Sequence, residues 1–268
     1  MLRILIVVVL LLSGISKIIY SQSIPKSLYI VNTLGENLSS INLDNHTVNQ
    51  NALALGLYTN EVKISGDKGY VINSGLNEIQ VFDLNTMTTT SKIQLESSTN
   101  PYNMDFINDS LAVISLLITN KLAIVNVYSG QIINSILVGN GPEGVKYYAG
   151  KIYVTNTNYN CVGYDPGTVS VIDAVSQTVV NTINVGTNPQ SEDIDINGNL
   201  IIGCTGNYSN ESGRVDVIDI SADTLKYSID FNTSITSVRI NSLNKLYIGK
   251  FGYGVMVYNL NTRTFERS

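Results

Sequence analysis

The chain has 268 residues and a formal net charge of −5, with 44% hydrophobic and only 14% charged residues. This balance excludes an intrinsically disordered chain, which would be poor in apolar residues and rich in charge. The acidic balance also argues against a nonspecific nucleic-acid binder, because such proteins need a basic face to release phosphate counterions.

The first predicted element is an apolar segment at the N-terminus. Arg3 gives it a positive end, and Ile4 to Leu12 is an unbroken apolar run followed by small residues. This run is shorter than the roughly 20 residues of a membrane span and is typical of a secretory signal. We therefore expect residues 1–22 to be a signal peptide and residues 23–268 to be the mature domain. The alternative is a retained N-terminal anchor.

After this segment, one pattern of strand, turn and strand recurs six times. The copies are residues 27–43, 69–84, 110–127, 150–173, 199–220 and 245–260. Aligned on their first strands, the copies place Tyr29, Tyr70, Ala112, Tyr153, Ile201 and Tyr247 at one position, with separations of 41, 42, 41, 48 and 46 residues. A fixed period of this length indicates a repeat architecture.

Two more strands lie between successive pairs. One is rich in Thr, Val and Ile, as in residues 89–95, 131–138 and 178–185. The other follows an Asn-Pro or Gly-Pro turn, as in residues 100–107, 141–148 and 188–196. Each repeat then holds four short antiparallel strands with period-2 patterning. The sequence therefore predicts an all-β fold, a β-propeller of four-stranded antiparallel blades.

The fourth copy carries a family motif. Tyr153-Val154-Thr155-Asn156, followed by residues 167–189, resembles the YVTN-type β-propeller repeat of secreted and surface-layer-like proteins of bacteria and archaea. The resemblance covers residues 24–268. It implies seven blades as a rule, whereas this sequence shows six strand pairs. Either six blades close imperfectly, or the sequence is a truncated seven-bladed ring. Some similar propellers capture vitamin-sized ligands, corrinoids among them.

Candidate ligand-binding residues lie in two kinds of loop that open on one face around the axial funnel. The loops that enter the innermost strands carry Asn60, Glu61, Tyr102, Asn103, Glu143 and Glu192, and the loops between second and third strands carry Asn156, Tyr159, Tyr164, Tyr208 and Tyr253. Amides, aromatic rings and carboxylates suit a polar organic ligand. The alternative for each asparagine is that it only stabilises its own turn.

Three of these residues are glutamates, which we expect at nearly the same blade position: Glu61, Glu143 and Glu192. Convergent carboxylates suit Ca²⁺ or general acid–base catalysis, as in glycoside hydrolysis. The alternative is that they are solvated loop residues. His46 is the only histidine, which removes multi-His zinc sites. The sequence contains no nucleotide-binding or haem motif, so we expect no metal or cofactor.

Cys161 and Cys204 are the only cysteines. Cys204 aligns with Asn156, so both thiols are expected on the same face of adjacent blades. A disulfide between them is one prediction for an exported protein, and two free thiols are the other.

These features predict a secreted, non-catalytic propeller whose funnel binds a small ligand, a glycan or a partner protein. One alternative is a carboxylate-dependent enzyme of the lyase, lactonase or glycosidase type in the same funnel. Another is a surface-layer or adhesion component. We expect no nucleic-acid partner, no transmembrane segment after signal cleavage, and a location outside the cell, in the periplasm or on the cell surface.

Overall fold

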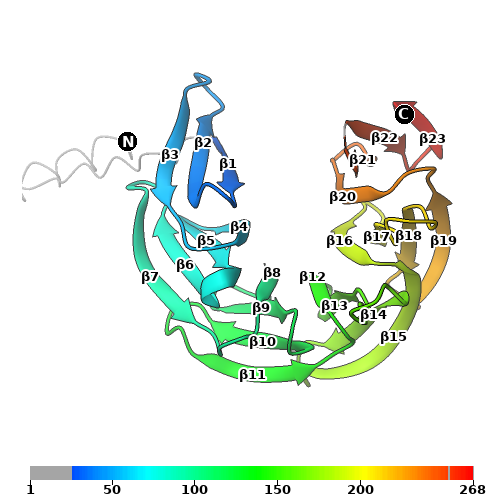
Figure 1. Cartoon of the computed structure of the whole chain (residues 1–268), viewed down its shortest axis with the longest axis horizontal. Helices are drawn as coiled ribbons and strands as arrows, with labels where there is room; N and C mark the ends of the chain where they lie inside the picture. Colours follow the sequence, from blue (N-terminus) through cyan, green and yellow to red (C-terminus); the bar gives the residue numbers. More distant parts are fainter. Residues whose placement is uncertain (1–25, 253, 268) are drawn as a thin grey trace, which may run out of the picture.

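The computed structural model describes residues 26–252 and 254–267. Their strands form six antiparallel sheets, which follow one another around a common axis as the blades of a six-bladed β-propeller (Figure 1). The predicted all-β propeller is confirmed. The expected signal peptide, residues 1–22, lies outside the described residues. In the part of the chain that the structure describes, no helix is long and apolar enough to cross a membrane.

The first three blades run from the blue to the green part of the ribbon in Figure 1. The first consists of β1 (Ser27–Asn32), β2 (Asn37–Asn42) and β3 (Val48–Ala54). The second consists of β4 (Thr59–Ser65), β5 (Lys68–Asn73), the short 3₁₀ helix η1 (Ser74–Leu76), β6 (Glu78–Asp83) and β7 (Thr88–Gln94). The third consists of β8 (Pro101–Phe106), β9 (Leu111–Leu116), β10 (Lys121–Asn126) and β11 (Ile132–Leu137).

The last three blades have four strands each. The fourth consists of β12 (Pro142–Tyr148), β13 (Lys151–Asn156), β14 (Pro166–Asp173) and β15 (Thr178–Thr187). The fifth consists of β16 (Pro189–Ile194), β17 (Leu200–Cys204), β18 (Arg214–Asp219) and β19 (Thr224–Asp230). The sixth consists of β20 (Ile235–Ile240), β21 (Lys245–Lys250), β22 (Val255–Asn259) and β23 (Thr264–Arg267).

In the five four-stranded blades, the strands lie in chain order from the axis outward. We call β4, β8, β12, β16 and β20 the inner strands. The first blade differs, because its first strand, β1, occupies the place that the second strand has in the other blades. It contacts β4, the inner strand of the next blade, in the same way as β5 contacts β8. The predicted four-stranded antiparallel blades are confirmed, and the first blade shows three of its strands in the described residues.

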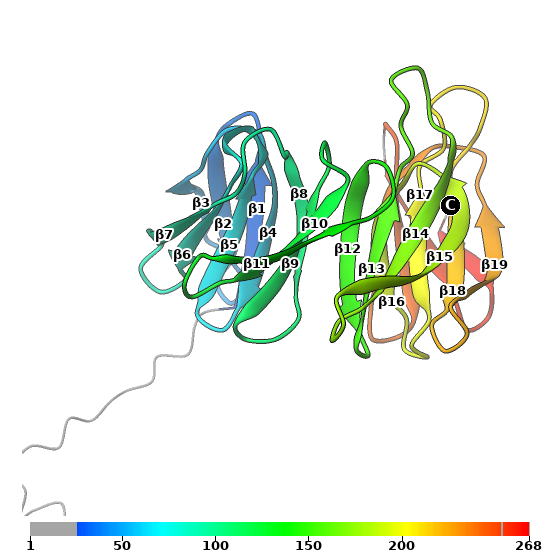
Figure 2. The ribbon, with the colours of Figure 1, turned by 90° about the horizontal axis from the view of Figure 1, so that it is seen from below.

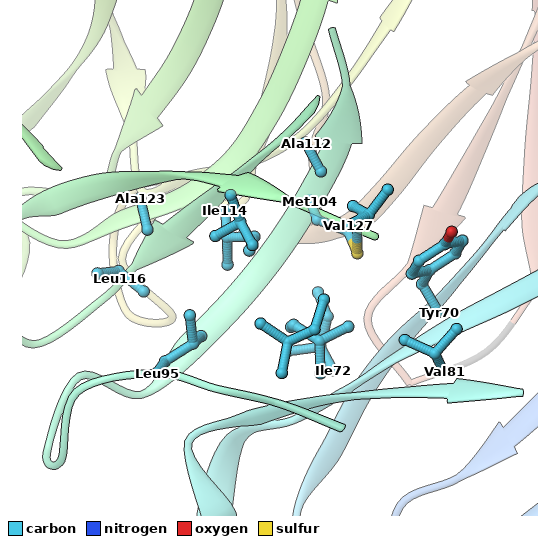
Figure 3. Close-up of a cluster of buried hydrophobic side chains, with 13 residues drawn as sticks. Tyr70, Ile72, Val81, Leu95, Met104, Ala112, Ile114, Leu116, Ala123 and Val127 are labelled. Atoms are coloured by element: carbon cyan, nitrogen blue, oxygen red, sulfur yellow. The ribbon is translucent and has the colours of Figure 1, made fainter. Parts of the chain in front are cut away.

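The hydrophobic core lies between the blades, as the period-2 patterning requires for sheets that are covered on both faces. Figure 3 shows one such layer, where Ile72 of the second blade packs near Met104 and Ile114 of the third. Tyr70 and Phe106 meet edge to face across the same layer, with ring centroids 5.0 Å apart. Each large apolar side chain buried in this way contributes about 1.5–3 kcal/mol. Packing between neighbours therefore holds each blade in place.

A buried asparagine fastens the inner part of the second blade. The Asn73 Oδ1 atom accepts hydrogen bonds from the Thr59 hydroxyl (2.8 Å) and the Gly56 N–H (3.1 Å). Its amide nitrogen donates to Glu78 Oε1 and Gln80 Oε1, both at 3.0 Å. Four bonds on one buried side chain link three strands and the loop before β4, so Asn73 stabilises the blade rather than facing a ligand.

The hairpin between the third and fourth strands closes in the same way in every blade. In the second blade, Asp83 Oδ1 accepts the backbone N–H groups of Asn85 (2.9 Å) and Thr86 (2.8 Å). The corresponding residue is Asn42, Asn126, Asp173, Asp219 or Asn259 in the other five blades. These are Asx turns, in which a side-chain oxygen replaces a backbone carbonyl as acceptor.

Candidate functional site

One face of the propeller, which we call the mouth, gathers the starts of the inner strands and the loops after the second strands. Pro142 at the start of β12 pairs with Asn156 at the end of β13, so both kinds of loop open on this side. The β13–β14 and β17–β18 loops rise from it in Figure 2. The predicted convergence of the two loop types is therefore present in the structure.

Four aromatic side chains follow one another along the mouth, over the fourth, fifth and sixth blades. Ring centroids are 5.0 Å apart for Tyr159 and Tyr164, 6.1 Å for Tyr164 and Tyr208, and 5.6 Å for Tyr208 and Phe251. We call them the aromatic row. Tyr164 is half-buried and the other three rings are exposed. A row of exposed rings offers extended apolar faces to a ligand.

The row begins at a cavity of about 340 Å³ between the third and fourth blades. Tyr159 and Tyr164 line it on the side of the loop, together with Cys161. Glu143 lines it from the start of β12, and the rest of the wall is Leu117, Ile118, Asn120, Asn140, Gly141 and Thr157. A small cavity lined by two tyrosine rings and a carboxyl group is suited to a ligand that has a ring and polar substituents.

The carboxyl group of Glu143 is buried in this wall. Its pKa is raised to about 8, chiefly by burial; a hydrogen bond from the Tyr102 hydroxyl opposes the rise, and the nearby charge of Glu192 contributes to it. The pKa of the Tyr102 hydroxyl is also raised: burial is the main cause, and the charge of Glu143 is the second. Among the described residues, no group donates to Glu143 Oε2. At neutral pH this oxygen can serve a ligand donor without the cost of a buried charge.

The three predicted glutamates lie close to one blade position, as expected, but not at the same one. The pairing of each inner strand with its second strand gives the position of each residue in the blade. Glu192 pairs with Ile202. Glu143 lies between Pro142, which pairs with Asn156, and Val145, which pairs with Val154. Val145, which opposes Val154, is the residue that matches Glu192. The three therefore occupy three successive positions of the inner strand: first Glu143, then Glu61, then Glu192.

Glu192 consequently stands where the other inner strands carry an apolar side chain. The matching residues are Val62, Met104, Val145 and Val238. Its side chain reaches toward the fourth blade, where a Cβ built on Gly144 would lie within 1.7 Å of Glu192 Oε2. The other inner strands have Glu61, Asn103, Ser191 and Ser237 in place of this glycine. The missing side chain of Gly144 thus makes room for a buried carboxyl group.

The surroundings of Glu192 contain charges of both signs. Burial raises its pKa to about 7; Lys63 and Arg239 oppose the shift and Glu61 adds to it. Glu61 itself forms ion pairs with Lys63 (2.9 Å) and Arg239 (4.0 Å). These contacts span the axis, because Lys63 belongs to β4 and Arg239 to β20. Glu61 and Glu192 therefore belong to an axial charge cluster below the mouth, separate from the cavity.

Two aspartates of this axial cluster have structural partners. Asp105 Oδ2 accepts the backbone N–H of Tyr147 at 2.8 Å, and Lys146 lies 3.8 Å from the same oxygen. Asp193 Oδ2 accepts the backbone N–H of Ile240 at 2.8 Å. Each aspartate thus ties its own inner strand to that of the next blade. Within residues 26–252 and 254–267, no three His, Cys, Asp or Glu side chains gather closely enough to hold a metal ion.

The predicted asparagines have different surroundings. Asn60 is exposed and donates to the Ser74 hydroxyl at 2.7 Å. Asn103 is half-buried on β8. Asn156 is fully buried and donates to the hydroxyl groups of Ser170 (2.9 Å) and Thr168 (3.1 Å), so it acts within its own blade. Tyr253, the last predicted residue, lies outside the described residues.

The predicted disulfide does not form in this structure, because Cys161 and Cys204 are both free thiols. Cys161 is exposed in the long β13–β14 loop, whereas Cys204 is buried with its sulfur 3.8 Å from Asp216 Oδ2. Burial raises the pKa of the Cys204 thiol, and the charge of Asp216 adds to this. That carboxylate is fully buried and also accepts from the Arg214 guanidinium at 2.9 Å and the Gly186 N–H at 2.7 Å.

The sequence analysis missed Phe251 and the basic side chains of the axial cluster. Phe251 lies in the loop after β21, as Tyr159 and Tyr208 lie in the loops after β13 and β17, so its place in this type of loop was a usable signal. Lys63, Lys146 and Arg239 oppose Tyr70, Tyr153 and Tyr247 in the strand pairing, and the same alignment would have found them.

No family model matches the chain, and no curated protein matches it in sequence. Solved structures resemble it in fold. A chain of the hydrazine synthase of Kuenenia stuttgartiensis matches with a TM-score of 0.59 and 17% identity, over 74% of this chain, which spans 65% of the synthase chain. A chain of a mitotic checkpoint complex matches with a TM-score of 0.71 and 12% identity, over 92% of this chain and 74% of that one. At such identities these similarities show the shared β-propeller fold alone.

Proposed function

We propose that this chain is an exported, non-catalytic β-propeller of the YVTN type that binds a small, ring-containing polar ligand at its mouth. A glycan and a vitamin-sized cofactor both belong to this class. The proposal depends on one observation: the aromatic row begins at a cavity whose wall contains the buried carboxyl group of Glu143. Ring faces and a hydrogen-bonding group at one place suit such a ligand better than a long peptide or a nucleic acid.

The binding energy would come mainly from stacking on the row. An exposed tyrosine face contributes about 0.5–1.5 kcal/mol beyond the area that it buries. Glu143 Oε2 would accept a hydroxyl or amide donor of the ligand. Because the pKa of this carboxyl is raised to about 8, chiefly by burial, the group is neutral at pH 7, and its ionisation above pH 8 would strengthen the contact, since a carboxylate is the better acceptor.

The experiment is a thermal-shift screen of the full chain against oligosaccharides and cyanocobalamin, followed by titration calorimetry of any hit. A ligand that binds only the folded state raises the melting temperature as its concentration exceeds Kd. Tyr208→Ala is expected to weaken binding about tenfold. Tyr128→Ala is the control, because Tyr128 is also exposed but lies in the turn after β10, where the Lys68 ammonium group lies over its ring. Equal losses in both variants would contradict the proposal.

A second candidate function is supported by the pair of Glu143 and Tyr102. A buried carboxyl with a pKa near 8 beside a tyrosine hydroxyl is an arrangement that general acid–base catalysis uses. The lyase, lactonase or glycosidase alternative predicts turnover of a bound compound and its loss in Glu143→Gln, with binding retained. A bound ligand that is recovered unchanged after long incubation supports the binding protein instead.

Export is part of the proposal and follows from the N-terminal sequence pattern, with the periplasm, the cell surface and the medium as the candidate locations. The N-terminal sequence of the protein recovered from its producing cells tests it. A mature chain that starts near Gln22 is expected. A chain that retains residues 1–22 and sediments with membranes would support the retained anchor.

A further inference from the structure

The mouth has a second cavity, one blade before the cavity that Glu143 lines, which we now call the first cavity. The second cavity has a volume of about 290 Å³ and lies between the second and third blades. Its wall includes Tyr58, Ser74, Gly75, Asn77, Asn100 and Ile118. Ile118 also lines the first cavity, so the two cavities adjoin at this side chain.

The two cavities are built from the same positions of the repeat. Two of these positions follow the second strand, one directly precedes the third strand, and one directly precedes the inner strand of the next blade. The residue pairs that match, one blade apart, are Ser74 and Leu117, Gly75 and Ile118, Asn77 and Asn120, and Asn100 and Gly141. The second cavity is therefore the structural counterpart of the first, displaced by one blade.

An asparagine fixes the shape of each cavity. The Asn77 Oδ1 atom accepts the backbone N–H groups of Thr99 and Asn100, both at 3.0 Å. One blade later, Asn120 Oδ1 accepts the backbone N–H of Gly141 at 2.9 Å. Each asparagine thus ties its own blade to the loop that enters the next inner strand. These bonds hold the two sides of each cavity together, which preorganises the cavity for binding.

Tyr58 gives the second cavity an aromatic ring, and its backbone has an unusual conformation for a tyrosine. Its side chain is 64% exposed, and its φ angle of 50° lies in the left-handed region that glycine and asparagine tolerate best. The matching residues before other inner strands are Asn100, Gly141 and Asn188, with φ angles of 49°, 63° and 57°. A tyrosine is less stable than these residues at such a position, so the strain points to a function for its ring.

The loop after β5 makes room for this ring. A Cβ built on Gly75 would lie 2.8 Å from Tyr58 Cδ2 and 2.9 Å from Leu57 Cβ, too close for either contact. The Ser74 N–H donates to the Tyr58 carbonyl oxygen at 3.2 Å, which holds the tyrosine against the loop. Each cavity therefore has an aromatic ring in its wall, Tyr58 in the second and Tyr159 in the first.

The other lining groups are mainly amides, hydroxyls and aliphatic side chains. Among the described residues, no Asp, Glu, Lys, Arg or His lines the second cavity. Glu143 is the one such residue in the wall of the first cavity, and with a pKa of about 8 it is neutral at pH 7. A charged polymer would find no counter-charge in either cavity. Neutral polar groups beside an aromatic ring suit an uncharged sugar, whose hydroxyls need partners and whose apolar face stacks on the ring.

Because the cavity recurs from one blade to the next, its ligand should also have a repeating structure. We propose that the mouth binds a linear chain of uncharged sugar units, and that successive units occupy the second cavity, the first cavity and the aromatic row. This inference rests on the proposed binding at the mouth and adds the length and neutrality of the ligand. Tyr58 would then stack on a unit that a short sugar, bound at the first cavity, does not reach.

Titration calorimetry with cellobiose, cellohexaose, chitobiose and chitohexaose tests this inference. At least one hexaose is expected to bind about tenfold more tightly than its two-unit counterpart. Tyr58→Asn removes the ring but should keep or raise the melting temperature, because asparagine holds the matching position in the third and fifth blades. It is expected to weaken binding of the hexaose about tenfold and to leave binding of the two-unit sugar unchanged. Tyr128→Ala, outside the mouth, should change neither affinity.

The outcomes separate this inference from the proposed function. Equal affinities for short and long sugars overturn the inference, and so does a hexaose affinity that Tyr58→Asn leaves unchanged. A lower melting temperature of Tyr58→Asn with equal losses for both lengths would show a structural role and also overturn it. In these cases a loss of affinity in Tyr208→Ala still supports binding at the mouth. If cyanocobalamin binds and no sugar does, the inference alone fails, whereas a chain that binds neither contradicts both.

Discussion

Glu192→Gln is expected to make the protein more stable at alkaline pH. The carboxyl of Glu192 is buried at a position that is apolar in four other blades. Its pKa in the folded protein is about 7, compared with 4.5 for an ordinary glutamate. Between these values the unfolded chain has released a proton that the folded chain still holds. Stability contributed by this group is therefore lost as the pH rises from about 4.5 to 7.

The magnitude follows from the size of the shift. Each pKa unit corresponds to about 1.4 kcal/mol, so the rise of the Glu192 pKa from 4.5 to about 7 implies a cost of about 3 kcal/mol above pH 7. Glutamine has nearly the same shape but does not ionise. The substitution should therefore have a small effect at pH 5 and raise the free energy of unfolding by about 2–3 kcal/mol at pH 8.

Urea unfolding followed by circular dichroism, at pH 5 and at pH 8, measures this difference. Glu96→Gln is the matched control, because Glu96 is exposed in the turn after β7. It should change the free energy of unfolding little at either pH. If Glu192→Gln and the unsubstituted chain show the same dependence on pH, the carboxyl does not carry the proton that its burial implies, and the reasoning is refuted.

Three further predictions concern other parts of the molecule. Asn73→Ala should lower the free energy of unfolding by about 2–4 kcal/mol in urea, because it leaves several buried groups without partners; a loss below 1 kcal/mol would contradict its central role. Arg214→Ala should cost about 3 kcal/mol in the same assay, because the buried carboxylate of Asp216 loses its counter-charge, and Arg214→Lys should restore part of that loss. Iodoacetamide should label Cys161 alone in the native protein and Cys204 only after denaturation, as mass spectrometry of the two peptides can show; native labelling of both thiols would contradict the burial of Cys204.

Much of the fold could be predicted because each blade repeats local signals. The period-2 patterns place Tyr70, Tyr153 and Ile201 at one position of the second strand, and the structure confirms this alignment. The Asn-Pro and Gly-Pro turns correctly predict where inner strands begin. These signals depend on a few neighbouring residues, so they are readable without knowledge of the tertiary structure.

The exact positions of the glutamates were also encoded in the sequence but were predicted only approximately. Counted from the proline that starts each inner strand, Met104, Val145 and Glu192 are each three residues on, while Glu143 is one residue on. Glu61 is two residues after Thr59, which replaces the proline in the second blade. Because strand faces alternate with every residue, an error of one position moves a side chain to the other face.

The aromatic row and the exposure of Tyr247 could not be predicted from the sequence in this way. Tyr164 and Tyr208 are 44 residues apart, and their rings meet only because neighbouring blades bring two loops together. The exposure of Tyr247 depends on the absence of a sheet beside it among the described residues, although its own strand looks like those of the other blades. Both features arise from how blades are placed in space, which no single repeat encodes.

The Asx turns at the third hairpin of each blade have a consequence for the substitutions that the chain tolerates. Three blades use Asp and three use Asn at this place, and both residues accept the same two backbone N–H groups through Oδ1. An Asn126→Asp substitution would therefore yield a residue that already accepts these bonds in the second blade. The protein can gain or lose negative charge along its outer rim without altering a hairpin, so its solubility can change independently of its architecture.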